Sequence, residues 1–201
     1  MAALLRRVPV LGHPCGNLLV VQLLSILVYP FLGDQPLGRA VFSIFALVVL
    51  AFAVGAVRLT PALSWVAALL GVPVVVLTVW EAVAPGTEWV VLWSSAFHAA
   101  FYFYTGYALI RYMFDDLVVT TDEVFATGAT FTVVAWAFAY LYLAVDIVWP
   151  GSFTVVGDPL QARAWFDLLF ASVTTMTNTG LSDIVPVLPQ ARAVVLSLIH
   201  I

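Results

Sequence analysis

The chain has 201 residues, of which 64% are hydrophobic and only 9% are charged, and its formal net charge is −4. A water-soluble domain of this length needs far more charge to cover its surface, so the composition indicates an integral membrane protein in a lipid bilayer. The seven basic residues are all arginines scattered along the chain, so no basic patch exists and no nucleic-acid partner is expected. The single cysteine, Cys15, excludes an internal disulfide, and we expect it to pack as a small residue near a helix start.

Five uncharged runs are long enough to cross the hydrocarbon core of a bilayer as helices, which takes about 20 residues. Each run holds 18 to 22 residues, and they cover 14–33, 40–57, 59–80, 89–110 and 124–145. The breaks between them are short, polar and mostly marked by proline or glycine. We therefore predict an all-α, multi-pass protein of the cell membrane.

The arginines near the ends of these runs indicate the orientation, because positive residues collect on the cytoplasmic side. A cytoplasmic N-terminus places four arginines inside and three outside. The inner arginines are Arg6, Arg7, Arg58 and Arg111, and the outer ones are Arg39, Arg163 and Arg192. We predict that the N-terminus is cytoplasmic.

A cluster of acidic residues separates the first four helices from the fifth. It consists of Asp115, Asp116, Asp122 and Glu123. We place a domain boundary here, with residues 1–118 as a four-helix transmembrane region and residues 119–201 as a second domain. Thr120 or Thr121 is the expected N-cap of the fifth helix, with Asp122 and Glu123 favourably placed in its first turn.

Residues 164–186 combine a short helix with a polar loop. The helix has about a dozen residues, too few to cross a bilayer, and Asp167 in its first turn complements the positive end of its dipole. The threonine-rich loop, residues 177–183, follows and contains one glycine. Irregular backbone at membrane depth is tolerated only where protein buries it or where it lines a water-filled cavity, so we expect this loop to line a pathway. The hydroxyls of Thr174, Thr175 and Thr177 either face that pathway or bond to helix carbonyls.

These residues resemble the two-helix pore module of potassium channels. Residues 174–186 read Thr-Thr-Met-Thr-Asn-Thr-Gly-Leu-Ser-Asp-Ile-Val-Pro beside the family string T-T-L-T-T-V-G-Y-G-D-I-x-P, and residues 168–172 are similar to the family's L-Y-F-S stretch. The resemblance covers about two fifths of the chain, from residue 122 onward. It implies an outer helix, a re-entrant pore helix, a filter loop and an inner helix, of which residues 190–201 are too few to span the bilayer.

The resemblance also implies a homotetramer that conducts monovalent cations without a cofactor. Backbone carbonyls of the filter would replace the hydration shell of K⁺ or Na⁺. The implied filter residues are Thr177, Asn178, Thr179, Gly180, Leu181 and Ser182. Asp183 would lie at the outer mouth, where four copies raise the local cation concentration. Its alternative role is to cap the next segment.

Three departures from the family string leave the ion preference open. Asn178 replaces a threonine, Leu181 replaces the bracing tyrosine, and Ser182 replaces the second glycine, whose positive φ serine disfavours. A single glycine followed by a small polar residue is also similar to the loops of potassium transporters of the Trk/Ktr kind. We expect K⁺ to be favoured over Na⁺, with weak selectivity.

The four preceding helices carry no voltage sensor, because 89–110 contains no arginine and only Arg111 follows it. His98 is the one ionisable side chain deep in this run, and it is either a functional group such as a pH sensor or a hydrogen-bonded buried histidine. Trp165 and Phe166 are expected to anchor or pack the short helix rather than to touch an ion.

No enzyme is expected, since the sequence contains neither a metalloprotease nor a serine-hydrolase motif and no Cys/His pair within reach of each other for catalysis. The main hypothesis is an ion channel subunit. The alternative is a non-conducting or transporter-like membrane subunit that keeps the pore fold.

Overall fold

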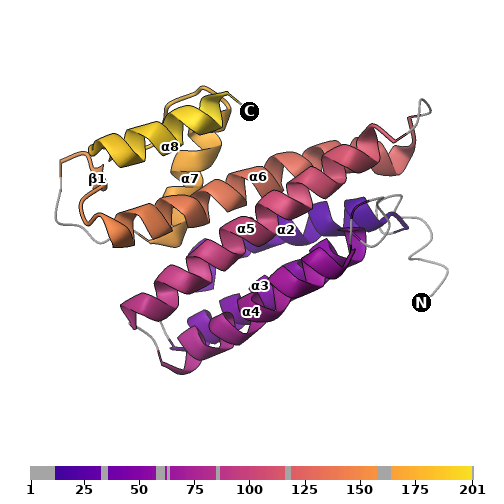
Figure 1. Cartoon of the computed structure of the whole chain (residues 1–201), viewed down its shortest axis with the longest axis horizontal. Coiled ribbons are helices and arrows are strands. Elements are labelled where there is room, and N and C mark those ends of the chain that lie inside the picture. The colour runs from indigo at the N-terminus through magenta and orange to yellow at the C-terminus, as the bar shows by residue number, and fades with distance from the viewer. Residues whose placement is uncertain are drawn as a thin grey trace.

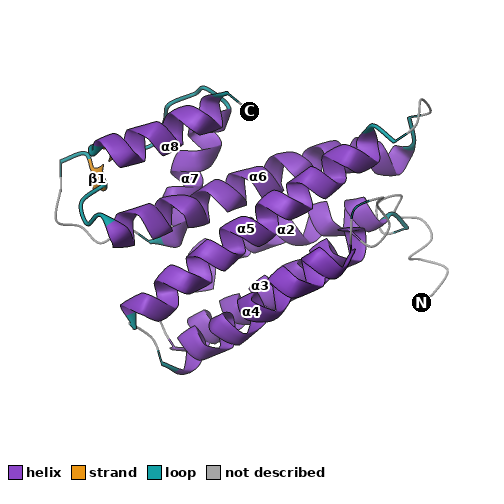
Figure 2. Cartoon of the chain, viewed as in Figure 1, coloured by secondary structure: helices purple, strands orange, loops and turns teal. Residues whose placement is uncertain are grey.

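The structure, a computed structural model, describes residues 12–32, 36–57, 62, 64–84, 87–115, 119–157 and 164–200, except for the side chains of residues 32–43. This part of the chain is mostly helical (Figures 1 and 2). It contains seven helices and one pair of short strands. The helices are α2 (Pro14–Leu32), α3 (Pro36–Val57), α4 (Ser64–Val83), α5 (Glu88–Met113), α6 (Thr121–Val148), α7 (Trp165–Met176) and α8 (Pro189–Ile199). The strands are β1 (Phe153–Val155) and β2 (Ile184–Pro186).

Three of these helices, α2, α4 and α6, are long and apolar enough to span a membrane. Their candidate spans are Pro14–Phe31, Ser64–Val83 and Thr121–Val148. The side chains described for α3 give only the shorter apolar stretch Ile44–Val57, and α5 is less apolar because serine, threonine, histidine and tyrosine interrupt it. The chain is therefore a mostly helical protein suited to a membrane, as its composition predicted.

Helix α6 is the centre of the arrangement. It runs alongside α5 over much of its length, and α2 packs against it as well (Figure 1). Helices α3 and α4 complete the bundle by packing on α2 and α5, whereas α7 and α8 lie on the other side of α6. Because both groups of helices share α6, any movement of this helix affects both.

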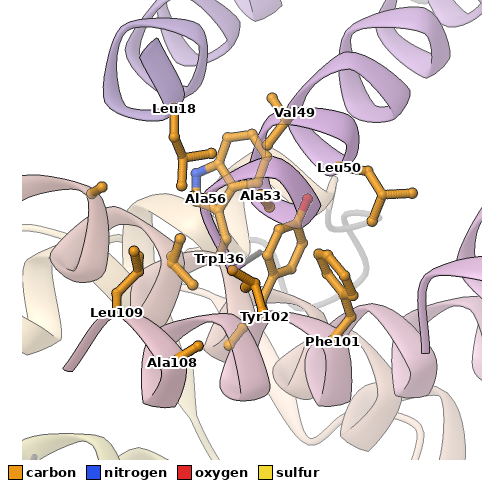
Figure 3. Packing of buried hydrophobic residues seen from close by; sticks show 14 of the residues in the cluster. Leu18, Val49, Leu50, Ala53, Ala56, Phe101, Tyr102, Ala108, Leu109 and Trp136 are labelled. Atoms are coloured by element: carbon orange, nitrogen blue, oxygen red, sulfur yellow. The ribbon is translucent and has the colours of Figure 1, made fainter. Parts of the chain in front are cut away.

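The buried core is built from small and aromatic side chains of α2, α3, α5 and α6. Figure 3 shows the Trp136 indole of α6 beside Leu18 of α2 and Tyr102 of α5. The rings of Tyr102 and Trp136 meet edge to face, with centroids 5.6 Å apart. Such a contact is worth about 0.5–1.5 kcal/mol beyond the burial of its surface.

The start of α6 is fixed by a capping box. The Thr120 side chain accepts the Glu123 N–H at 3.3 Å, and the Glu123 carboxylate accepts the Thr120 N–H at 2.8 Å. Thr120 is the N-cap, which confirms one of the two predicted positions.

Asp122, next to this cap, lies in the first turn of α6 as predicted, and it also contacts two other helices. Its carboxylate accepts the backbone N–H of Cys15 at 3.1 Å and the Tyr112 hydroxyl at 3.2 Å. It thereby satisfies a free amide in the first turn of α2 and joins α2, α5 and α6. Cys15 itself is a buried free cysteine, as expected from the sequence.

The strand pair was not predicted. β1 and β2 are antiparallel, with Phe153 opposite Pro186 and Val155 opposite Ile184. Phe153 and Ile184 are buried in a cluster with residues of α6, α7 and α8. The pair connects the segment that follows α6 to the segment that follows the threonine-rich loop, so both ends of this loop are held by regular structure.

Candidate functional site

Helix α7 presents the threonine-rich loop, residues 177–183, at its C-terminal end. Its first turn is stabilised by Asp167, whose carboxylate accepts the Ala164 N–H at 3.0 Å, as its position in the sequence suggested. One face of the helix is buried against its neighbours and consists of Leu168, Leu169, Ala171, Ser172 and Thr174. The helix is therefore fixed at its start and along one side.

Aromatic side chains hold the first turn of α7 in place. Trp165 packs against Trp136 and Tyr140 of α6, with ring centroids 5.4 and 5.2 Å away. Phe166 stacks on Tyr29 of α2 at 4.7 Å. The expectation that Trp165 and Phe166 pack the helix is confirmed.

The loop turns back on the end of α7 through one carbonyl group. The Thr174 carbonyl oxygen accepts the N–H of Thr179 at 2.9 Å, the N–H of Gly180 at 3.2 Å and the hydroxyl of Thr179 at 3.2 Å. The N–H groups of Thr177 and Asn178 bond to earlier carbonyls of the same helix. All four amides are thus used to close the helix end, in the manner of a C-cap.

Two loop residues adopt the left-handed backbone conformation that this closure requires. Gly180 has φ +61° and Asn178 has φ +56°. Asparagine tolerates this region better than most residues, which explains why it fits here in place of threonine. Ser182 does not share this conformation, so the second position of positive φ implied by the family string is absent.

The carbonyl oxygens of residues 177–181 have no hydrogen-bond donor within the part of the chain that the structure describes. Residues 177–181 are also exposed. A backbone carbonyl without a donor needs water or a bound ion as its partner. The loop therefore offers a row of free oxygen ligands, the kind of ligand that hard cations prefer.

The hydroxyls of Thr174 and Thr177 donate to carbonyl groups of α7. Thr174 donates to the Phe170 carbonyl at 2.9 Å, and Thr177 donates to the Val173 carbonyl at 2.9 Å. For these two residues the helix-bonded interpretation is confirmed.

Ser182 and Asp183 end the loop in different ways. The Ser182 hydroxyl accepts the Ile184 N–H at 3.0 Å, a contact that the sequence did not suggest. Asp183 is exposed, and only its backbone carbonyl is bonded, to the N–H of Val156 at 2.8 Å. Asp183 does not cap the next helix, whose N-cap is Leu188, so its carboxylate faces the surface beside the loop.

The six predicted filter residues and Asp183 are exposed, except for Ser182, which is half-buried. Within the described ranges, no three histidine, cysteine or carboxylate side chains come together as a metal site.

His98 lies apart from the loop, in the middle of the bundle. It is only 4% exposed, its Nδ1 is 2.8 Å from the Ser94 carbonyl, and its Nε2 is 3.5 Å from the Thr78 hydroxyl. It is therefore a hydrogen-bonded buried histidine, one of the two interpretations drawn from the sequence.

Comparison of the chain with protein-family models, with curated proteins and with solved structures finds no match.

Proposed function

We propose that this protein is a subunit of a homotetrameric channel that conducts monovalent cations, with K⁺ favoured, across the cell membrane. The observation that carries the proposal is that the N–H groups of the threonine-rich loop bond within the protein whereas its carbonyl groups do not. Its N–H groups close the end of α7, and the carbonyls of residues 177–181 have no donor in the described chain. Four such loops around one axis would form rings of carbonyl oxygens that replace the hydration shell of a cation.

The electrostatics of α7 favour the same ligand. The loop lies at the C-terminal end of the helix, where the dipole carries a partial negative charge of about half an electron. Asp183 adds a full negative charge at the far end of the loop, exposed to solvent. Both features attract cations and repel anions.

In this proposal α2 to α5 form the four-helix region (1–118), and α6 is the outer helix of the pore domain (119–201). Helix α7 is re-entrant and α8 begins the inner helix. The N-terminus is cytoplasmic. This orientation was predicted from the arginines. Residues 6, 7, 58 and 163 and the side chain of Arg39 lie outside the described residues. Arg111 is exposed and donates a hydrogen bond to the Tyr107 hydroxyl at 3.1 Å.

Cation flux from liposomes tests the proposal. The purified protein is reconstituted, and efflux is compared for K⁺, for Na⁺ and for N-methyl-D-glucamine, a cation too large for a carbonyl filter. We expect flux of K⁺ and slower flux of Na⁺, from a particle with the mass of four chains. No flux of either ion would contradict the channel and favour the alternative of a non-conducting or transporter-like subunit. Equal flux of K⁺ and Na⁺ would contradict only the ion preference.

A further inference from the structure

The side chain of Gln22 is buried in the middle of α2 without a hydrogen-bond partner. Its exposed fraction is 0%, and neither Oε1 nor Nε2 is bonded to any residue that the structure describes. Leaving an amide unbonded is costly at membrane depth, where no bulk water reaches it. Because buried polar side chains are nearly always bonded to protein or to ordered water, this amide indicates a further partner.

A second polar atom in the same situation lies on α6. The indole Nε1 of Trp136 is buried, and its N–H meets no acceptor among the described residues. Figure 3 shows this nitrogen beside Leu18 of α2. Leu18 and Gln22 are one turn apart on the buried face of α2, so the indole N–H and the Gln22 amide belong to the same part of the core.

Ring contacts enclose Gln22 from the other end of α2. Trp136 meets the ring of Trp165, the first residue of α7, with centroids 5.4 Å apart. Trp165 in turn meets the ring of Tyr29 at 6.1 Å, and Tyr29 follows Gln22 by two turns of α2. The two indoles therefore lie beside α2 one turn before Gln22 and two turns after it, and the amide lies between these contacts.

The neighbouring buried hydroxyl groups do not bond to Gln22. Ser25 of α2 donates to the Val21 carbonyl at 2.8 Å, and Thr132 of α6 donates to the Gly128 carbonyl at 3.0 Å. Each of these hydroxyls is thus bonded to its own helix. The amide and the indole N–H therefore need a ligand that is not part of the chain.

We propose that a water molecule is bound between α2 and α6 by Gln22 and Trp136. The Trp136 N–H and the Gln22 NH₂ group are donors, whereas Gln22 Oε1 is an acceptor, so the ligand has to accept and donate hydrogen bonds at once. Water does both, and a buried water makes about three hydrogen bonds. An ion does not fit, because an unpaired buried charge is unstable and the one buried carboxylate of the described residues, Glu123, is bonded in the capping box of α6.

This water joins α2 to the helix on which α7 also packs. Nuclear magnetic resonance of the full chain in detergent micelles, with isotope-labelled tryptophan, detects it at the Trp136 indole proton, which the Trp136→Phe variant assigns. We expect a through-space cross-peak between this proton and water, with the sign in the rotating frame that separates it from chemical exchange. The cross-peak should disappear in Gln22→Met, a side chain of similar size without the amide, and persist in Gln190→Met, at an exposed glutamine of α8.

A Trp136 indole proton without a water cross-peak overturns the proposal, and so does a cross-peak that is unchanged in Gln22→Met. If Trp136→Phe does not fold, the wild-type spectrum decides, because a spectrum in which no slowly exchanging indole proton has a water cross-peak contradicts the bound water. Neither result depends on ion flux, so the outcome is separate from that of the proposed channel.

Thermal unfolding tests whether the two side chains share this ligand. We expect Gln22→Met to lower the unfolding temperature by about 2–4 °C more in the wild type than in the Trp136→Phe background. The added apolar surface is common to both backgrounds, so the difference reports the shared partner. Gln190→Met should give the same shift in both backgrounds. Equal shifts for Gln22→Met in the two backgrounds contradict a ligand held by both residues.

Discussion

The backbone N–H of Gly180 lies 3.2 Å from the carbonyl oxygen of Thr174, six residues earlier, and bonds to it. This bond reverses the chain at the end of α7 and leaves the carbonyls of the loop without donors. A Cβ atom added at Gly180 would meet no atom within 4 Å, so glycine is required here for its backbone conformation rather than for space. The threonine-rich loop thus depends on one glycine.

Ser182→Gly is predicted to raise the preference for K⁺. Glycine adopts the positive-φ conformation that serine disfavours. The outer part of the loop can then point its carbonyls inward, as a loop with the potassium-channel sequence does. The permeability ratio of K⁺ to Na⁺, measured by flux under opposed gradients, should rise several-fold. Ser182→Ala is the matched control, because it removes the same hydroxyl bond to Ile184 without the added freedom. Equal ratios in the two variants would contradict this role of position 182.

Asp122→Ala is predicted to destabilise the fold by on the order of 2 kcal/mol. The variant leaves the Cys15 amide and the Tyr112 hydroxyl without their charged acceptor, and hydrogen bonds to charged groups contribute about 1.5–3 kcal/mol each. Thermal unfolding in detergent micelles, followed by circular dichroism, measures the change. Asp115→Ala, at an exposed carboxylate, should stay within about 0.5 kcal/mol of the wild type. Similar losses in both variants would show that Asp122 does not join the helices.

Gly128→Val is predicted to destabilise the contact between α6 and α2. A Cβ atom at Gly128 would lie 3.0 Å from a methyl group of Leu19, so the larger side chain forces the two helices apart at a cost of about 1–3 kcal/mol. Gly55→Val, in α3, is the control, because a Cβ atom there meets nothing within 4 Å. The same unfolding assay should separate the two variants. If Gly55→Val is as damaging as Gly128→Val, close packing at Gly128 is not the cause.

The sequence predicted the helices well because their apolar runs are long. The five predicted runs are helical over the residues that the structure describes, apart from Ala62 before the start of α4, and the ends differ by a few residues. Helix α3 begins at Pro36 rather than at residue 40, since proline is favourable in a first turn. The predicted start of the third run, 59–61, lies outside the described residues, and α4 begins at Ser64.

Contacts between distant parts of the chain could not be predicted. The strands β1 and β2 have three residues each and lie about 30 residues apart, too short for a periodic pattern to show. Asp122 lies in the first turn of its own helix, as expected, but its bond to Cys15, 107 residues away, could not be predicted from the sequence. At the loop, the sequence predicted a short helix followed by a polar segment, whereas the return of the N–H groups to Thr174 is a property of the folded backbone.

The most direct test of the central claim is K⁺ flux through Gly180→Ala beside Gly157→Ala. Both glycines have positive φ, +61° and +91°, and neither has an atom within 4 Å of an added Cβ. Alanine in the left-handed region, where Gly180 lies, costs about 1–2 kcal/mol, and Gly157, with φ beyond that region, is no more tolerant of alanine, so the control carries at least as much backbone strain. If the loop carbonyls bind the permeating cation, Gly180→Ala lowers K⁺ flux about tenfold or more, the equivalent of about 1.4 kcal/mol, whereas Gly157→Ala conducts like the wild type. Wild-type flux in Gly180→Ala would contradict the account.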